Sequence, residues 1–194
     1  MKNIIIALLL ILTVEGLTAQ TYFEPAAQDV YVPSKSQKAV RTATDVGLVF
    51  LPVAALTTTL VQKDWKGLVQ GLEVAGGTIA TTFILKGIVQ ERRPDGSNMH
   101  SFPSGHTAFT FASAAYLQRR YGWKFGAPAY AVATFVGWGR IYAKRHHVWD
   151  VVAGGAIGAG FAYLFTTPFA RKHNLAVSPV TDGSNVGLYA TMEF

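Results

Sequence analysis

Three short segments of the chain carry basic and imidazole side chains at spacings that suit the chemistry of phosphate transfer. The first segment runs from Lys86 to Arg93-Pro94, the second is Pro103-Ser104-Gly105-His106, and the third holds Arg140, His146 and Asp150. A phosphoryl group in transfer carries negative charge on its equatorial oxygens, so catalysis depends on positioning and on fixed positive charge. Together the segments supply fixed cations, two histidines and one carboxylate.

The cations and the second segment predict a phosphate-binding site. The guanidinium groups of Arg93 and Arg140 can each grip two oxygens, and Lys86 adds a point charge. Ser104 is placed to cap a helix whose first N–H groups would bind an anion, and Gly105 lets the backbone approach the phosphate without a Cβ atom. These segments contain no Cys pair, carboxylate cluster or metal-spaced pair of histidines. We therefore expect a site that uses no metal and no other cofactor.

His146 and Asp150 are four residues apart, which places them on one face of a helix if the last helix begins early. A carboxylate on one ring nitrogen fixes the tautomer and leaves the other nitrogen free to attack phosphorus. His147 is adjacent, but its spacing to Arg140 and to Asp150 differs by one residue. We therefore place His147 at the periphery of the site or on the surface.

In this order, the three segments resemble the signature of the type 2 phosphatidic acid phosphatase (PAP2) superfamily. That family includes membrane lipid phosphatases, bacterial acid phosphatases and vanadium haloperoxidases. The resemblance implies that His146 is the nucleophile, that it forms a phosphohistidine, and that Asp150 orients it. It also implies that His106 protonates the leaving alcohol and then activates water.

One position departs from the family pattern. The residue before the third-segment arginine is usually Ser, and here it is Gly139. A hydroxyl donor to the phosphate is therefore replaced by a backbone N–H. A lower affinity or a wider pocket is the expected result.

Composition excludes several functional classes. Hydrophobic residues make up 50% of the chain and charged residues 14%, which is apolar for a soluble protein. The net charge is +6, but the cations gather at the phosphate segments and at helix ends rather than in a stripe with stacking aromatics. Nucleic-acid binding is therefore disfavoured. The absence of cysteine excludes a disulfide framework, a thiolate nucleophile and a cysteine metal site.

The N-terminus has the features of an export signal. Lys2 precedes the apolar run Ile4–Val14, and Leu17-Thr18-Ala19 resembles a cleavage site. The run is short for a membrane span, so we predict cleavage after Ala19, with an uncleaved anchor as the alternative. We divide the chain into this signal (residues 1–19), an N-terminal surface segment (20–43), a helical phosphatase domain (44–170) and a C-terminal tail (171–194).

We predict an all-α fold, a bundle of about five core helices with a short hairpin-like β tail. The expected helices cover residues 45–62, 66–89, 105–120, 125–143 and 149–169. Small residues fill positions 153–160 and would allow close contact with another helix. In the tail, the run Asp182-Gly183-Ser184-Asn185 is typical of a hairpin turn.

We expect the helices to span a membrane, with a soluble periplasmic helical bundle as the alternative. Residues 151–169 form a charge-free run near spanning length. Alternating helix directions bring all three segments to one side and the non-catalytic cations between helices to the other, as the positive-inside rule asks. With an export signal, the segment side is the periplasm. The predicted location is therefore a bacterial inner membrane, with the active site facing the periplasm.

The leading function is hydrolysis of a phosphate monoester or pyrophosphate of a lipid, of the isoprenyl pyrophosphate, lipid A or phosphatidate class. The short separation of Pro94 and Pro103 favours the membrane members of the family that the chain resembles. The alternatives are a soluble broad-specificity periplasmic acid phosphatase, a vanadium-dependent haloperoxidase, and a lipid-binding or structural membrane protein with a relict site. The expected partners are a phosphorylated lipid and the membrane; the oligomeric state stays open.

Overall fold

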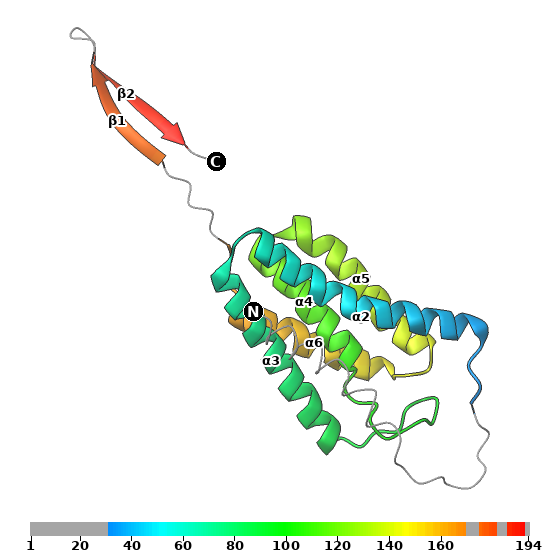
Figure 1. Ribbon diagram of the computed structural model, residues 1–194. Helices are drawn as coiled ribbons and strands as arrows, with labels where there is room; N and C mark the ends of the chain where they lie inside the picture. The colour runs from blue at the N-terminus through cyan, green and yellow to red at the C-terminus, as the bar shows by residue number, and fades with distance from the viewer. Residues whose placement is uncertain (1–30, 170–174, 182–185, 193–194) are drawn as a thin grey trace. The chain divides into compact units, whose positions relative to one another are not determined.

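The computed structural model describes residues 31–169, 175–181 and 186–192. These ranges contain five α-helices: α2 (Lys35–Val61), α3 (Trp65–Ile88), α4 (Gly105–Tyr121), α5 (Trp123–Tyr142) and α6 (Val148–Phe165). Strands β1 (Leu175–Thr181) and β2 (Val186–Met192) pair antiparallel in the segment where a hairpin was predicted. The predicted helical bundle is confirmed (Figure 1). The predicted export signal lies outside the described residues.

The first described helix begins earlier than its composition indicated. We expected a polar surface segment to continue to residue 43, but α2 begins at Lys35. Ser34 Oγ accepts a hydrogen bond from the Gln37 N–H, and the Gln37 side chain accepts one from the Ser34 N–H. This capping box satisfies donors that a helix start otherwise leaves unpaired. The other four helices begin and end within a few residues of their predicted limits.

Helix α4 lies at the centre of the bundle and contacts each of the other four described helices (Figure 1). Its alanines, such as Ala108 and Ala112, are buried. Helix α6 meets α4 with glycines. A Cβ atom at Gly154 would lie 2.5 Å from the Ser104 carbonyl oxygen, and one at Gly158 would overlap the Ala108 carbonyl oxygen. The predicted close contact of the small residues is therefore confirmed, and its partner is the backbone of α4.

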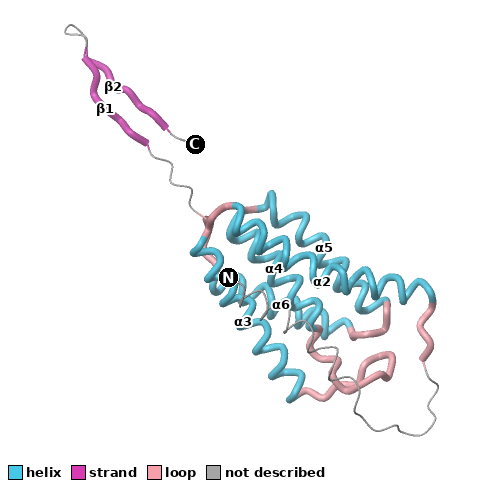
Figure 2. The backbone as a smooth tube through the Cα atoms, in the orientation of Figure 1, coloured by secondary structure: helices cyan, strands magenta, loops and turns pink. Residues whose placement is uncertain are grey.

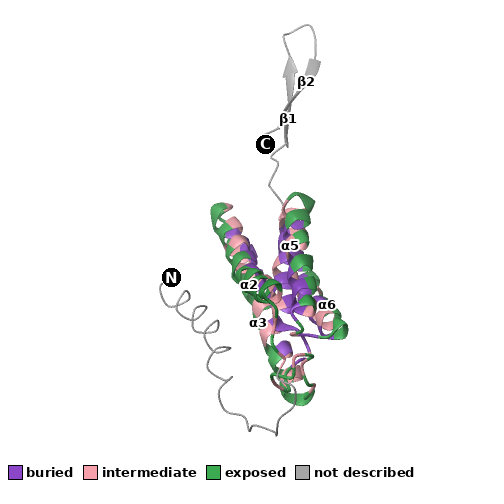
Figure 3. Ribbon diagram, turned by 90° about the vertical axis from the view of Figure 1, so that its right-hand side faces the viewer, coloured by how far each residue is buried: buried purple, intermediate pink, exposed green. Residues whose placement is uncertain are grey.

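Many large hydrophobic side chains lie among the exposed residues of the bundle, whose exposed surface Figure 3 shows in green. Large hydrophobic side chains are exposed along α2, α3, α5 and α6, whereas many buried positions are Thr, Ala or Gly. Such a surface suits a lipid environment, in which small residues let helices pack and polar groups must pair internally. Helices α2, α3 and α6 are each long and apolar enough to cross a membrane. The chain is a membrane protein, although the sequence had singled out only the last of these helices as a charge-free run.

The connections between helices gather at two ends of the bundle (Figure 2). Residues 89–104 and 143–147 lie where α3 and α5 end and α4 and α6 begin; we call this the motif end. Residues 62–64 and Gly122 form the opposite end. All three segments with potential chemistry therefore meet at one end, as predicted from the alternating helix directions.

A buried ion pair organises the opposite end. Asp64 caps α3 by accepting a hydrogen bond from the Gly67 N–H, and both its carboxylate oxygens lie 2.6 Å from Arg120 nitrogens. Arg120 also donates to the Thr167 carbonyl oxygen at 2.7 Å. Burial opposes ionisation of Asp64, but the hydrogen bonds from Arg120 and Gly67 outweigh it and lower the pKa of Asp64. Arg120 is one of the non-catalytic cations that the alternating helix directions place at this end, and its pairing with Asp64 cancels its charge.

Arg120→Met should lower the free energy of unfolding by about 3–5 kcal/mol, because it leaves Asp64 as a buried carboxylate without its counter-charge. Thermal unfolding of the purified protein in detergent measures this loss. Arg119→Met is the matched control, since Arg119 is an exposed cation on the same helix turn. The control should cost less than about 1 kcal/mol. Equal losses in the two variants would show that the ion pair with Asp64 contributes no more to the free energy of unfolding than an exposed arginine does.

Candidate active site

The turn between α5 and α6 places His146 in the interior of the motif end. The backbone N–H groups of Arg145 and His146 both donate to the Arg140 carbonyl oxygen, at 3.0 and 3.3 Å, so the chain folds back over the end of α5. His146 is only 2% exposed. Its Nδ1 donates to the Ser101 carbonyl oxygen at 2.8 Å and lies 3.4 Å from Asp150 Oδ2. Because Nδ1 carries the proton in this arrangement, Nε2 holds the lone pair of the ring.

The ring of His146 is held in its neutral form. Burial, as the largest cause, lowers the pKa of His146 to about 3, and the charges of Arg93, Arg140 and Lys86 act in the same direction. The hydrogen bond with Asp150 opposes them. These cations come from separate segments, and their common action on one ring confirms that the fold brings the segments together. A neutral imidazole with a free nitrogen is the form that nucleophilic attack requires.

Asp150 orients the His146 ring less directly than its spacing suggested. The carboxylate is fully buried, and its Oδ2 accepts hydrogen bonds from Ser101 Oγ at 2.5 Å and from the His147 N–H at 2.8 Å. The predicted contact with His146 is present, but the nearer acceptor of the ring proton is the Ser101 carbonyl oxygen. Ser101 therefore holds both members of the pair, which no spacing rule had indicated.

Hydrogen bonds to the loop between α3 and α4 orient the two cations of the first segment, Lys86 and Arg93. Lys86 Nζ donates to the carbonyl oxygens of His100, at 3.1 Å, and Pro103, at 2.8 Å. Arg93 donates through Nε to Asn98 Oδ1 at 2.8 Å and through Nη2 to the His100 carbonyl oxygen at 3.4 Å. These acceptors are neutral oxygens, so these hydrogen bonds fix the two cations in place without adding a counter-charge.

An ion pair fastens this loop to the third segment. Arg145 Nη1 lies 2.7 Å from Asp95 Oδ2 and 3.1 Å from Ser97 Oγ. Burial opposes ionisation of Asp95, but the hydrogen bonds from Ser97 and the charge of Arg145 outweigh it and lower the pKa of Asp95. The pair holds the first and third segments together at the surface of the site.

The second segment starts α4, as predicted. Ser104 is its N-cap: the buried Oγ accepts hydrogen bonds from the Thr107 N–H at 3.5 Å and from Thr107 Oγ1 at 3.0 Å. The Ser104 N–H donates to the Asp150 carbonyl oxygen at 2.9 Å, so this donor serves the fold. Gly105 is the first helical residue, where N–H groups have no carbonyl partner within the helix. The role of Ser104 and Gly105 toward phosphate stays a prediction, with the Gly105 N–H as the better placed donor.

A residue that the sequence did not identify joins two of the predicted site residues. Asp45 Oδ1, on α2, lies 2.8 Å from His106 Nε2 and 3.0 Å from Arg140 Nη1. Arg140 also approaches Thr44 Oγ1 at 3.4 Å. Its Nε is buried and finds no hydrogen-bond partner in the part of the chain that the structure describes. A buried donor without an acceptor is costly, and a phosphate oxygen would satisfy it.

Gly139 is closely packed. A Cβ atom there would overlap Thr44 Cγ2 and lie 3.0 Å from Val40 Cγ1, both on α2. The expectation of a wider pocket at the missing serine is therefore wrong, because α2 fills the space. The glycine is what allows α2 to approach α5 closely enough for Asp45 to reach Arg140.

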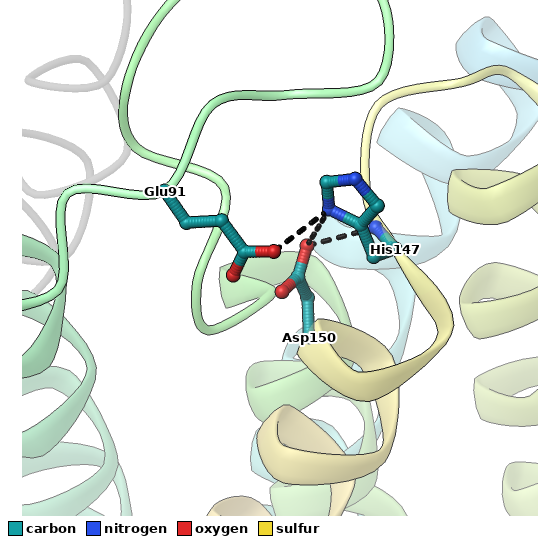
Figure 4. A group of neighbouring side chains, drawn as sticks. All are labelled: Glu91, His147 and Asp150. Carbon is teal, nitrogen blue, oxygen red and sulfur yellow. Dashed lines mark hydrogen bonds and ion pairs between the residues drawn. The ribbon is translucent and has the colours of Figure 1, made fainter.

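Three side chains, one of them Asp150, form a cluster with the geometry of a cation site (Figure 4). Glu91, His147 and Asp150 offer ligand atoms within 4.8 Å of one another, and His147 Nδ1 lies 3.1 Å from Glu91 Oε1. Burial, followed by the charge of Asp150, raises the pKa of Glu91. The sequence did not predict this cluster, because Glu91 lies far from the other two along the chain. A cation there would compete with the contacts through which Asp150 helps to orient His146. His147 stands at the edge of the site, as predicted, with its side chain 43% exposed.

The chain matches one protein family and is similar to two phosphatases of lipid A. Residues 67–173 match the PAP2 superfamily. The chain is 34% identical over 137 residues to a lipid A 4'-phosphatase of Helicobacter pylori, which covers 63% of this chain and 68% of that protein. It is 44% identical over 69 residues to a lipid A 1-phosphatase of Porphyromonas gingivalis, a match that covers 34% of this chain and 16% of that protein.

Two solved structures share the fold. The crystal structure of LpxE from Aquifex aeolicus matches with a TM-score of 0.59 at 21% identity, over 72% of this chain and 87% of that chain. A transmembrane PAP2 type phosphatidylglycerolphosphate phosphatase from Bacillus subtilis matches with a TM-score of 0.54 at 22% identity, over 82% and 92% of the two chains. At these identities the likeness concerns the arrangement of the helices.

Gly139→Ser should destabilise the contact between α2 and α5 by about 1–3 kcal/mol, since the new Cβ atom would overlap Thr44 Cγ2. Thr44→Ser removes that methyl group and keeps the hydroxyl that faces Arg140. The double variant should therefore regain most of the loss, and Thr44→Ser alone provides the control. Thermal unfolding in detergent compares the three variants with the natural protein. A Gly139→Ser variant of unchanged stability would show that the helices separate without cost.

Proposed function

The chain belongs to the PAP2 superfamily, and from this we propose that it is a phosphatase of membrane lipids whose substrate is lipid A or a phosphorylated lipid of that class. The carrying observation is a buried, neutral His146 under the charge of three cations, at one end of a bundle with an apolar exterior. The two relatives named for lipid A support this substrate class. The proposed location is the inner membrane, with the motif end facing the periplasm.

In the first step of the proposed reaction, Nε2 of His146 attacks phosphorus while the bond to the lipid oxygen breaks. The leaving oxygen takes a proton from His106. As the His146 ring gains charge, its Nδ1–H stays bonded to the Ser101 carbonyl oxygen beside the carboxylate of Asp150. The buried guanidinium of Arg140 offers donors to the phosphoryl oxygens, whose charge it stabilises.

In the second step, water hydrolyses the phosphohistidine. The neutral His106 removes a proton from water, the resulting oxygen attacks phosphorus, and the P–N bond breaks. The bonding electrons return to Nε2 of His146, so the ring is neutral again and inorganic phosphate leaves. Both histidines finish in their starting protonation states, and no metal ion takes part.

Interfacial aromatic residues support a lipid substrate. Trp138, Tyr142 and Trp149 are exposed near the motif end, and the first two stack with ring centroids 5.1 Å apart. Trp65 and Trp123 are exposed at the opposite end. Tryptophan and tyrosine concentrate where the bilayer meets water, so the site lies at the depth of a lipid head group. The apolar exterior likewise favours the membrane enzyme over a soluble acid phosphatase.

His146→Ala should lower kcat by about 10³-fold or more, because the proposed nucleophile is lost. His147→Ala should retain most of the activity, since the hydrogen bond from the His147 backbone N–H to Asp150 Oδ2 survives the change and, of the contacts with Asp150, only the longer one of the ring, at 3.6 Å, is lost. Release of inorganic phosphate from lipid A in detergent micelles measures both. An inactive His147→Ala beside an active His146→Ala would reverse the assignment.

His106→Ala should trap the phosphoenzyme when p-nitrophenyl phosphate is the substrate. The p-nitrophenolate group leaves without a proton, whereas the attack of water then lacks its base. Rapid quenching should show a burst of one p-nitrophenolate per enzyme and an acid-labile phosphohistidine that is absent from His146→Ala. The burst should persist in excess chelator, because the proposed chemistry uses no metal. Turnover without any phosphoenzyme, or a burst that chelator abolishes, would contradict the mechanism.

The proposed topology is testable by labelling single cysteines in a chain that contains none of its own. Met99→Cys changes an exposed residue of the motif end, and Lys124→Cys changes an exposed residue of the opposite end. A membrane-impermeant maleimide should label position 99 in intact spheroplasts and position 124 only after the membrane is disrupted. Labelling of position 124 in intact cells would place the motif end on the other side.

A further inference from the structure

We propose that Asp45 is the positioning residue for His106, and that its carboxylate aims this ring and the Arg140 guanidinium at the same phosphate group. The inference rests on the proposed function, because it assigns Asp45 a role through the general acid and base of that reaction. Asp45 belongs to α2 and lies outside the three sequence segments.

The hydrogen bonds of Asp45 determine which nitrogen of His106 can act. One carboxylate oxygen, Oδ1, accepts from His106 Nε2 at 2.8 Å and from Arg140 Nη1 at 3.0 Å. Since a carboxylate only accepts, Nε2 carries a proton, and Nδ1 becomes the nitrogen that exchanges its proton with the leaving group and with water. Each catalytic histidine is then fixed through one ring nitrogen and works through the other: His146 through Nε2 and His106 through Nδ1.

The packing of α2 delivers this carboxylate. A Cβ atom at Gly139 would overlap Thr44, the residue before Asp45, and one at Gly47 would lie 2.6 Å from Val136 Cγ2 on α5. Glycines on both helices therefore allow their close approach at the level of the site. The Asp45 side chain is 50% exposed, whereas the side chains of His106 and Arg140 are 13% and 4% exposed. Ion pairs that reach solvent contribute little stability, which favours a role in orientation over one in holding the fold.

The charges around Asp45 set the sign of the expected pH effect. The carboxylate faces His106 from α4 and Arg140 from α5, and Arg41 on α2 acts on it at longer range. A carboxylate stabilises the protonated imidazole. Without it, His106 loses its proton at lower pH, and the general acid of the first step is depleted sooner as the pH rises.

Asp45→Asn tests the proposal in the full-length protein in detergent. For lipid A, whose leaving oxygen needs a proton, kcat should fall about 10-fold or more with little change in KM. The alkaline limb of the kcat–pH profile should move to lower pH by about one unit. p-Nitrophenyl phosphate, whose leaving group needs no proton, should still phosphorylate His146 in Asp45→Asn, which shows that the variant is folded and that His146 is intact. Asp45→Glu should restore the limb, and Asp45→Ser supplies a second neutral variant should Asp45→Asn fail to fold.

Asp95→Asn is the matched control, because it removes a carboxylate of the motif end whose ion pair is with Arg145. Its alkaline limb should stay in place. The inference is overturned if Asp45→Asn keeps the natural kcat and the alkaline limb of its kcat–pH profile stays at the natural position. It is also overturned by tighter binding of orthovanadate with an unmoved limb, since Asp45 would then be a competitor for the phosphate position. An active His106→Ala variant would instead refute the proposed function itself.

Discussion

The arrangement of the site depends on how closely the backbones of α4 and α6 approach each other. Gly154 and Gly158 let α6 lie directly against the carbonyl oxygens at the start of α4. One turn before Gly154, the Asp150 carbonyl oxygen accepts the Ser104 N–H. This contact brings the beginning of α4, which carries His106, beside the beginning of α6 and the turn that carries His146. Larger side chains on α6 would separate the two helices and, with them, the two histidines on which the proposed reaction depends.

Several cations gathered at one site repel one another, and the fold must hold them in place. Neutral acceptors contribute to this: Lys86 and Arg93 both donate to the His100 carbonyl oxygen. Burial, and to a smaller extent the field of these cations, keeps His146 neutral. An anion entering the site therefore meets fixed positive charge and an unprotonated nitrogen at once, with no reorganisation to make first.

The sequence predicted the helices and the three segments because both leave local signals. Apolar stretches between short breakers indicated the five helices, and the residue spacings indicated the cations and histidines. Contacts between residues far apart in the chain leave no such signal. Asp45 lies on a helix outside the segments, Glu91 meets His147 only through the fold, and Arg120 finds Asp64 across the bundle. In the sequence, Gly139 was only a departure from the family pattern. The packing of Thr44 against it shows that the glycine allows α2 to approach α5 closely.

The two ends of the bundle use arginine in opposite ways. At the opposite end, Arg120 meets both oxygens of Asp64 and the Thr167 carbonyl oxygen, so its charge and its donors are satisfied within the protein. At the motif end, Arg140 is just as buried, yet its Nε has no acceptor among the described residues and its one carboxylate partner is half exposed. An unsatisfied buried donor costs stability. That cost is expected where a ligand completes the hydrogen bonds. The contrast between Arg120 and Arg140 therefore separates the end that stabilises the bundle from the end that is proposed to bind phosphate.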